Sequence, residues 1–324
     1  RNPEINIPHG VLLYLHVSLV VLGFPQRYNV SLTMRITNKY SLPEVFERFN
    51  RANKHSAEGA DISVTHLIDS PRIRHLQAAH NHEISVDISD MALSILGTAV
   101  HKILEDGAEH TSATAERRFH ATIDGMSVSG QVDLMTPTEN GFILSDYKTV
   151  KAFSIQVDPQ GKASWERQLN MYATLAEHNG FEISAIEVIA IVRDWSAAGL
   201  NRNSDYPEAP IVRIPIQLWD PETRMEYFQK RVHMHLSVSD ESLCTPEDRW
   251  SQPTTWAVHE FTKAGTMKKR ASRLFDTHYD AMEFSIGITG KTEIIERSGR
   301  DVRCEGNYCD VSEYCTQWRN ENGK

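Results

Sequence analysis

Several features that would identify a protein class at once are missing from this sequence of 324 residues. No G-x-G-x-x-G follows an expected strand and no Walker lysine loop is present, so a nucleotide cofactor is not indicated. Internal repeats and low-complexity tracts are also missing. Positive charge is not in excess, because the formal net charge is −9. This balance argues against a protein that binds nucleic acid by bulk charge, but it is compatible with a nucleic-acid enzyme that has a local basic groove.

Long hydrophobic runs are missing too. The longest, residues 11–24, has 14 residues with the sequence VLLYLHVSLVVLGF, whereas a membrane span needs about 20. The flank before it is nearly neutral and no small-residue cleavage site follows, which argues against a signal peptide. We therefore treat residues 1–33 as an extension of uncertain status. We expect no membrane association and a cytoplasmic location.

Cysteine is scarce, with 4 residues in the whole chain. All of them lie in its last quarter: Cys244, Cys304, Cys309 and Cys315. Disulfides would need an oxidising compartment, and nothing in the sequence places the chain in one. The last three cysteines have the spacing C-x4-C-x5-C, which lacks the C-x2-C pairs usual in zinc sites. A four-iron–four-sulfur cluster also takes four thiolates, often spread along the sequence. Iron–sulfur, zinc and unrelated free thiols are thus the alternatives.

The remaining composition is that of an ordinary globular protein, with 40% hydrophobic and 24% charged residues, which excludes a largely disordered chain. Apolar residues at helical spacing predict helices over residues 42–52, 63–79, 87–107, 165–179 and 220–236. Alternating or continuous apolar patterns predict strands over residues 115–124, 126–135, 142–149 and 183–192, with a turn over residues 136–141. This order predicts an α/β layered domain with a mixed sheet. We expect a core over residues 34–236 and a loop-rich, four-cysteine C-terminal segment over residues 237–324 that packs on it.

The expected hairpin carries a group of charged residues. Asp146 and Lys148 point to the same face of their strand, and Asp133 on the neighbouring strand can approach Asp146 across the ladder. Two carboxylates brought together favour a cation between them, and Mg²⁺ takes oxygen ligands of this kind. Such a metal lowers the pKa of bound water and stabilises charge on a phosphoryl group, while Lys148 can position the water. By itself, D-x-K is common, and a solvated surface hairpin is the simpler interpretation.

Four short motifs in order change that interpretation. They are Gly97-x-x-x-His101, Gly130-x-x-Asp133, Asp146-x-Lys148 and Gln168-x-x-x-Tyr172. The ordered set resembles the PD-(D/E)XK nuclease superfamily, specifically its RecB-type exonuclease branch, over about residues 63–194. The resemblance implies a restriction-endonuclease-like core, in which a central mixed β-sheet is flanked by helices. Val132 replaces the proline that the family places before its first aspartate, a variation that the RecB-type branch tolerates.

The same resemblance implies roles for individual residues. The ligands of Mg²⁺ or Mn²⁺ would be His101, Asp133, Asp146 and the backbone carbonyl oxygen of Tyr147. Lys148 would be the catalytic lysine. Gln168 and Tyr172, one helical turn apart, would hold the DNA strand or orient Lys148. Glu116, near the start of the first strand, would be a supporting acidic residue.

The resemblance also implies an activity. The chain would be a metal-dependent exonuclease that hydrolyses phosphodiester bonds at single- or double-stranded DNA ends, in replication, recombination or repair and together with proteins of those processes. A restriction-like endonuclease with the same core and a catalytically inactive DNA-binding subunit are the alternatives. RecB-type nucleases of the AddB kind and of CRISPR adaptation carry a four-cysteine iron–sulfur cluster, with one cysteine before the core and three after it. Here all four follow the core, which departs from that arrangement. The tail also resembles that of small phage and bacterial RecB-type proteins, which implies a bacterium or a phage-infected host cell. The cluster is expected first, with zinc or unrelated thiols as the alternatives. Either metal centre would clamp the C-terminal segment onto the core.

A run of basic residues lies in the C-terminal segment. Residues 262–273 contain no acidic residue and carry five cations: Lys263, Lys268, Lys269, Arg270 and Arg273. This patch predicts either contact with DNA phosphates, which would be salt-dependent, or a solvated charged loop.

Overall fold

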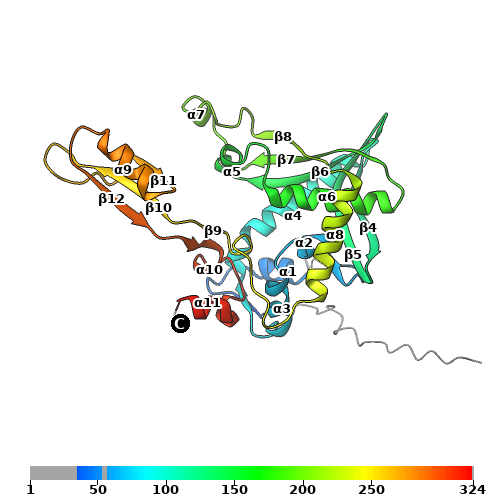
Figure 1. The fold of residues 1–324 in the computed structure, drawn as a ribbon. Helices are drawn as coiled ribbons and strands as arrows, with labels where there is room; N and C mark the ends of the chain where they lie inside the picture. Colours follow the sequence, from blue (N-terminus) through cyan, green and yellow to red (C-terminus); the bar gives the residue numbers. More distant parts are fainter. Residues whose placement is uncertain (1–34, 53–56, 323–324) are drawn as a thin grey trace, which may run out of the picture.

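A six-stranded mixed β-sheet forms the centre of the molecule (Figure 1). The structure, a computed structural model, describes residues 35–52 and 57–322. The strands are β2 (Ile62–Ser63), β4 (Thr114–Ile123), β5 (Met126–Thr138), β6 (Gly141–Val150), β7 (Ile183–Val192) and β8 (Ile211–Ile216). They follow the order β2-β5-β6-β7-β8, and β4 also pairs with β5. Two pairs, β2–β5 and β6–β7, are parallel and the others are antiparallel. The predicted α/β class and mixed sheet are confirmed.

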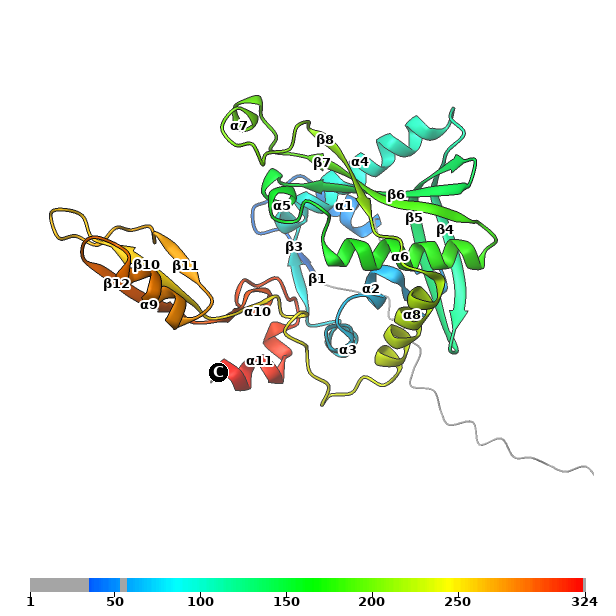
Figure 2. The same cartoon turned by 45° about the horizontal axis from the view of Figure 1, so that its top comes forward.

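Helices cover both sides of this sheet. They are α1 (Glu44–Ala52), α2 (Val64–Leu67), α3 (Pro71–Ala79), α4 (Ala92–Ala108), α5 (Ala152–Val157), α6 (Ala163–His178), α7 (Ala197–Leu200) and α8 (Pro221–Leu236). Figure 2 shows α4 on one side of the sheet and α6 and α8 on the other. The main core lies between the sheet, α6 and α8, and includes the fully buried Leu144, Leu175 and Phe228.

Two predicted helices are broken. The helix expected over residues 63–79 is divided into α2 and α3 at residues 68–70, because Pro71 occupies the first turn of α3, where its missing N–H leaves no bond unmade. The helix expected over residues 87–107 begins with a 3₁₀ turn, η1 (Ile88–Met91), and continues as α4. Asp87 caps this turn by accepting a hydrogen bond from the N–H of Ser89. It also ends β3 (Ser85–Asp87), which pairs in parallel with β1 (Arg35–Thr37).

The hairpin turn is shorter than predicted. β5 continues to Thr138, and only Glu139 and Asn140 form the turn. Gly141 follows with a φ of +113°, and a Cβ there would lie 2.5 Å from the carbonyl oxygen of Glu182. Glycine is therefore required at the start of β6.

The expectation that the chain is loop-rich after residue 237 is wrong for residues 255–297, which we call the arm. The arm is a three-stranded sheet with one helix: β10 (Thr255–Glu260), β11 (Arg273–Phe275), β12 (Thr292–Arg297) and α9 (His278–Ile286). Two short paired strands, β9 (Ser251–Gln252) and β13 (Arg300–Asp301), connect it to the rest. The arm projects away from the central sheet in both views (Figures 1 and 2). Its strands are short and charged, so they carry little periodic signal.

The other parts of the C-terminal segment lie beside α3. The chain ends in α10 (Val302–Glu305), η2 (Ser312–Tyr314) and α11 (Thr316–Asn322). A second, small apolar cluster joins Ile73 and Leu76 of α3 to Cys309, Val311 and Cys315. No helix in the described residues is long and apolar enough to cross a membrane. The extension expected over residues 1–33 lies outside the described residues.

Candidate active site and cysteine site

A cleft opens where β5 and β6 separate. The two strands pair from Thr138 and Gly141 as far as Leu134 and Ser145, and no further. Beyond that point the carboxylate of Asp133 accepts a hydrogen bond from the backbone N–H of Tyr147, 2.7 Å away, in place of a ladder bond. Asp133 and Asp146 lie at this point of separation, as the hairpin predicted. Both carboxylates are buried, with 7% and 3% of their surface exposed.

The residues of the four motifs line this cleft together. Its volume is about 700 Å³. Seven of the predicted site residues are in its wall: His101, Glu116, Asp133, Asp146, Lys148, Gln168 and Tyr172. They come from α4, β4, β5, β6 and α6, so five elements spread over more than seventy residues converge on one surface.

Three of these residues form a compact acidic cluster. Nδ1 of His101 lies 3.2 Å from Oε1 of Glu116 and 3.4 Å from Oδ1 of Asp133. Their ligand atoms all lie within 4.8 Å of one another. The hydrogen bond that His101 donates to the Glu116 carboxylate raises the pKa of the histidine. Burial and the neighbouring Asp146 carboxylate raise the pKa of Asp133 well above its ordinary range. The carboxylates of Asp133 and Asp146 therefore repel each other when no metal is bound, and a cation between them would relieve that repulsion.

Glu116 reaches the cluster through an unusual backbone conformation. It lies within β4 but has a φ of +50°, which L-residues other than glycine rarely adopt. Its second carboxylate oxygen accepts a hydrogen bond from Nε2 of Gln131 on β5. Gln131 occupies a variable position of the motif Gly130-x-x-Asp133 and was not among the predicted site residues. Strand alternation would have found it, since it lies two residues before Asp133 on the same face.

A second chain of polar contacts leads away from Asp146. Nζ of Lys148 lies 2.7 Å from Oδ2 of Asp146 and donates a hydrogen bond to Oε1 of Gln168 at 3.1 Å. Nε2 of Gln168 in turn donates to the hydroxyl of Tyr172 at 2.9 Å. Burial opposes the charge on Lys148, but Asp146 outweighs it and the pKa of the lysine is raised. Burial raises the pKa of Tyr172 to about 12. Lys148 is therefore a fixed cation, and Gln168 orients it.

The two motif glycines differ in whether packing requires them. A Cβ at Gly130 would lie 2.8 Å from the ring of Tyr172, so glycine lets α6 approach β5 closely. At Gly97, one helical turn before His101, a Cβ would meet nothing within 4 Å. Packing therefore does not require glycine at position 97, which lines the cleft.

Two predicted contributors lie elsewhere. The five basic residues of the 262–273 patch are exposed on the arm, and none is among the described residues that line the cleft. Lys268 pairs with Glu260 at 2.7 Å, and the guanidinium of Arg273 lies 5.1 Å from the ring centre of Phe275. Tyr147 contributes to the cleft through its backbone N–H, and its role as a carbonyl ligand stays a prediction.

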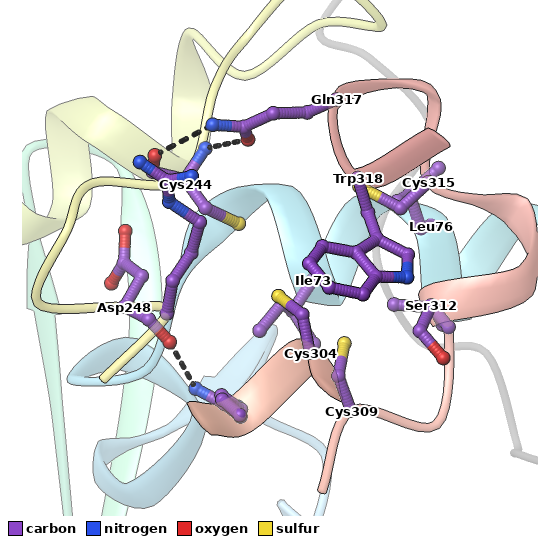
Figure 3. Close-up of a pocket in the computed structure, with 13 residues that line it drawn as sticks. Ile73, Leu76, Cys244, Asp248, Cys304, Cys309, Ser312, Cys315, Gln317 and Trp318 are labelled. Atoms are coloured by element: carbon purple, nitrogen blue, oxygen red, sulfur yellow. Dashed lines mark hydrogen bonds between the residues drawn. The ribbon is translucent and has the colours of Figure 1, made fainter. Parts of the chain in front are cut away.

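All four cysteines line one small pocket beside α3 (Figure 3). Their sulfur atoms surround a common space, together with Trp318. None of the four forms a disulfide. Burial, with the neighbouring cysteines, raises the pKa of Cys244 to about 11 and that of Cys304 to about 12. Four thiolates are thus unfavourable here without a metal cation. The free space is about 10 Å³, close to that occupied by one water molecule.

Hydrogen bonds connect this pocket to the α2–α3 connection. The hydroxyl of Ser70 lies 3.3 Å from the sulfur of Cys244. The guanidinium of Arg303, which also lines the pocket, donates to both carboxylate oxygens of Asp69, at 2.7 and 2.8 Å. Cys244 and the three later cysteines are distant in the sequence. These hydrogen bonds and the contacts with Ile73 and Leu76 hold both parts of the chain against α3 and the loop before it.

Comparison with known proteins adds little. No protein-family model matches the chain, and no curated protein matches it. One similar solved structure, described as "Crystal structure of SSO0001", is 16% identical over 63% of this chain and 85% of that chain, with a TM-score of 0.39. A likeness of this size carries no argument about fold or function, which therefore depend on the geometry above.

Proposed function

We propose that this protein is a metal-dependent DNA exonuclease with a PD-(D/E)XK core of the RecB type. One observation carries the proposal: the four ordered motifs come from four separate elements, α4, β5, β6 and α6, yet all of them line the same cleft. A chance set of common motifs would be scattered over the surface. The central mixed sheet with helices on both sides is the arrangement that such a core requires.

The acidic cluster fits a divalent cation. His101, Glu116 and Asp133 place their ligand atoms within 4.8 Å of one another, and the pKa of Asp133 is raised by burial and by Asp146. Oxygen donors with one imidazole suit Mg²⁺ or Mn²⁺. When bound, the metal would supply an activated water and would stabilise negative charge on a phosphoryl oxygen. We therefore propose Glu116 as a ligand beside His101 and Asp133, whereas Asp146, which pairs with Lys148, is not within that group.

The chain's own residues supply the remaining steps. Lys148, held by Asp146 and Gln168, presents a fixed positive charge to the attacking water and to the phosphate. The Tyr172 hydroxyl keeps its proton and fixes the amide of Gln168. The N–H of Tyr147 holds the Asp133 carboxylate in one orientation. The positions of charge are therefore set before substrate binds.

A digestion assay with Mg²⁺ or Mn²⁺ tests this proposal. Linear and covalently closed circular DNA are each incubated with the wild-type protein and with Asp146→Asn. We expect linear DNA to be degraded, closed circles to survive, and Asp146→Asn to lose at least about 100-fold in rate, since it removes charge beside Lys148 and the metal. Glu139→Gln is the matched control, because Glu139 is an exposed acid at the β5–β6 turn.

The outcomes separate the alternatives. Cutting of closed circles would favour a restriction-like endonuclease. DNA binding without any cutting would favour an inactive DNA-binding subunit. Equal rates for Asp146→Asn and the wild type would contradict both nuclease assignments.

For the four cysteines we propose a metal centre that fastens the C-terminal segment, with a four-iron–four-sulfur cluster as the first candidate. The convergence of all four thiols on one pocket supports a tetrathiolate site. The resemblance to RecB-type nucleases favours the cluster. The free space of about 10 Å³ favours a single ion such as Zn²⁺, because a cluster would require the side chains around it to move apart.

Anaerobic purification with an absorption spectrum and metal analysis decides between the two. A brown protein with about four irons per chain, whose colour is lost in Cys309→Ala, would establish the cluster. One zinc per chain and no colour would establish the zinc site. Protein that contains neither metal would contradict the proposal.

The basic patch of the arm is proposed as an auxiliary DNA contact. Its five cations are exposed and, apart from Lys268, make no ion pair within the described residues. Neutralising Lys269 and Arg270 together should lower DNA affinity and the salt dependence of binding. A pair of exposed lysines outside the arm, Lys39 and Lys230, is the matched control. The processes of replication, recombination and repair, and proteins that act in them, remain the proposed context.

A further inference from the structure

One cation on the cleft wall, Arg118, has no role in the arrangement described so far. It lies on β4, two residues after Glu116, and lines the cleft. Both side chains line the cleft, and residues two apart in an extended chain lie at most about 7 Å apart. That separation is comparable to the distance between successive phosphates of a nucleic-acid strand. A phosphate beside the acidic cluster would therefore have its neighbour near Arg118.

Two hydrogen bonds hold the guanidinium in place. Arg118 donates to Oε1 of Gln131 and, at 3.4 Å, to the hydroxyl of Ser129. Gln131 is the residue that donates to Glu116. Arg118, Gln131 and Glu116 thus form one connected network, so the guanidinium is fixed relative to the acidic cluster.

Glu58 covers the remaining side of the guanidinium. Its carboxylate oxygen lies 3.2 Å from Nε of Arg118 in an ion pair. Nε itself is buried and makes no hydrogen bond within the part of the chain that the structure describes. The Arg118 side chain is only 18% exposed, whereas that of Glu58 is 60% exposed. Water therefore reaches Glu58 more readily than Arg118, which is held in the cleft wall.

The other cations of the cleft are engaged differently. Lys148 is bound to Asp146 within the catalytic group. Lys102 is exposed and pairs with two acids of its own helix, Glu105 and Asp106. Neither lysine is both fixed in the cleft wall and paired with an exposed acid from another element, as Arg118 is with Glu58.

We propose that Arg118 binds the DNA phosphate next to the one that is cut, and that this phosphate displaces Glu58. A guanidinium presents a planar fork of donors that matches a phosphate. In the free protein, Glu58 occupies this position and keeps the buried charge paired. The inference depends on the proposed nuclease function and adds a substrate subsite to it.

The test measures DNA binding by Arg118→Gln and Glu58→Gln. Binding is followed with a labelled oligonucleotide in Ca²⁺ in place of Mg²⁺, over a series of salt concentrations. Arg118→Gln should weaken binding about tenfold and reduce the slope of log affinity against log salt by about 0.7 to 0.9, the share of one phosphate contact. Glu58→Gln should tighten binding about two- to fivefold, because the Glu58 carboxylate no longer competes with the phosphate for Arg118.

The opposite signs distinguish a binding role from a structural one. Damage to the fold would weaken binding in both variants, so weaker binding by Glu58→Gln would overturn the inference. An unchanged salt slope in Arg118→Gln, with wild-type protein that binds and cuts DNA, would overturn it as well and leave the nuclease assignment intact. Wild-type protein that neither binds nor cuts DNA would contradict the nuclease proposal itself. Arg118→Lys, which retains the charge but not the fork, should give an intermediate affinity with the wild-type slope.

Discussion

At the scale of single residues, Glu116 combines backbone strain with a place in the acidic cluster. Its φ of +50° within a strand costs about 1–2 kcal/mol for a residue with a Cβ. Strained conformations of this kind persist where the surrounding structure holds them, and they concentrate at functional sites. Here the hydrogen bonds to His101 and Gln131 hold the side chain in place. The strain thus supports the placement of the carboxylate.

We predict that glycine is more stable than alanine at position 116. Glu116→Ala and Glu116→Gly remove the same contacts, but only alanine keeps the steric penalty at positive φ. Glu116→Gly should therefore have a free energy of unfolding about 1 kcal/mol higher than Glu116→Ala, measured by urea denaturation. Both variants should lose nuclease activity, because both lose the carboxylate.

Thr122 provides the matched control on the same strand. It is exposed near the end of β4 and has no positive φ. There the order should be reversed, with Thr122→Ala about 0.5–1 kcal/mol more stable than Thr122→Gly. If alanine were more stable than glycine at position 116 as well as at position 122, the backbone of Glu116 would not be strained.

At the scale of elements, the periodic parts of the chain were predictable. The strand over residues 183–192 has the bounds of β7, and the helix over residues 220–236 differs from α8 by one residue. Both have long apolar patterns that only one type of element can bury. The hairpin also predicted the approach of Asp133 to Asp146, because strand pairing follows from a short turn.

Elements whose cause lies outside their own residues were not predictable. β2 has only two residues, and the arm consists of strands of three to six residues. Such segments become strands only when a partner supplies the hydrogen bonds. The contribution of Arg118 to the cleft was not predictable for a related reason. Arg118 belongs to no motif, and its importance follows from neighbours on another strand.

Helix α8 carries a buried histidine that makes stability depend on pH. His235 is 2% exposed, and its Nε2 lies 3.1 Å from the carbonyl oxygen of Leu67 in α2. Burial and the nearby Arg231 lower its pKa to about 4. Unfolding restores the pKa to about 6.5, so the unfolded chain binds the proton more readily. The stability is therefore complete above about pH 6.5 and is lost progressively as the pH falls toward 4.

We predict that His235→Gln flattens this dependence. Glutamine keeps a donor for Leu67 but does not titrate. Between pH 7 and pH 4 the wild type should lose up to about 3 kcal/mol more than the variant, measured by urea denaturation at each pH. His178→Gln, at an exposed position on α6, should leave the wild-type pH dependence nearly unchanged. Parallel pH curves for the wild type and His235→Gln would contradict the assignment.

At the scale of the whole molecule, the segment from β2 to α3 connects the two sites. Its beginning, Ser63 to His66, lines the cleft, and Ile73 and Leu76 line the cysteine pocket. Arg72, 2% exposed, donates to the carbonyl oxygens of Asp240 and Ser242 and to the hydroxyl of Thr316. One buried guanidinium thus holds both cysteine-bearing parts of the C-terminal segment against α3.

The apolar cluster beneath these contacts is small, so the proposed metal should supply much of the remaining stability. It contains only Ile73, Leu76, Ile84, Val311 and two cysteines as buried members. Metal binding by thiolates is coupled to folding, because no preformed site exists in the unfolded chain. The central sheet has its own, much larger core. The two parts should therefore respond differently when the metal is removed.

We predict that chelation opens the C-terminal parts and leaves the central sheet folded. After metal removal, amide hydrogen exchange should accelerate at residues 240–250 and 301–318, while β5, β6 and β7 keep their protection. Cys309→Ala should show the accelerated pattern before chelation and no further change after it. The metal could be shown to be lost while hydrogen exchange at residues 301–318 stays unchanged. That result would contradict this role, because Arg72 and Arg303 would then hold the segment without the metal. Loss of protection in the sheet to the same extent would contradict it too, because the metal would then stabilise one cooperative unit and not a clamp on its surface.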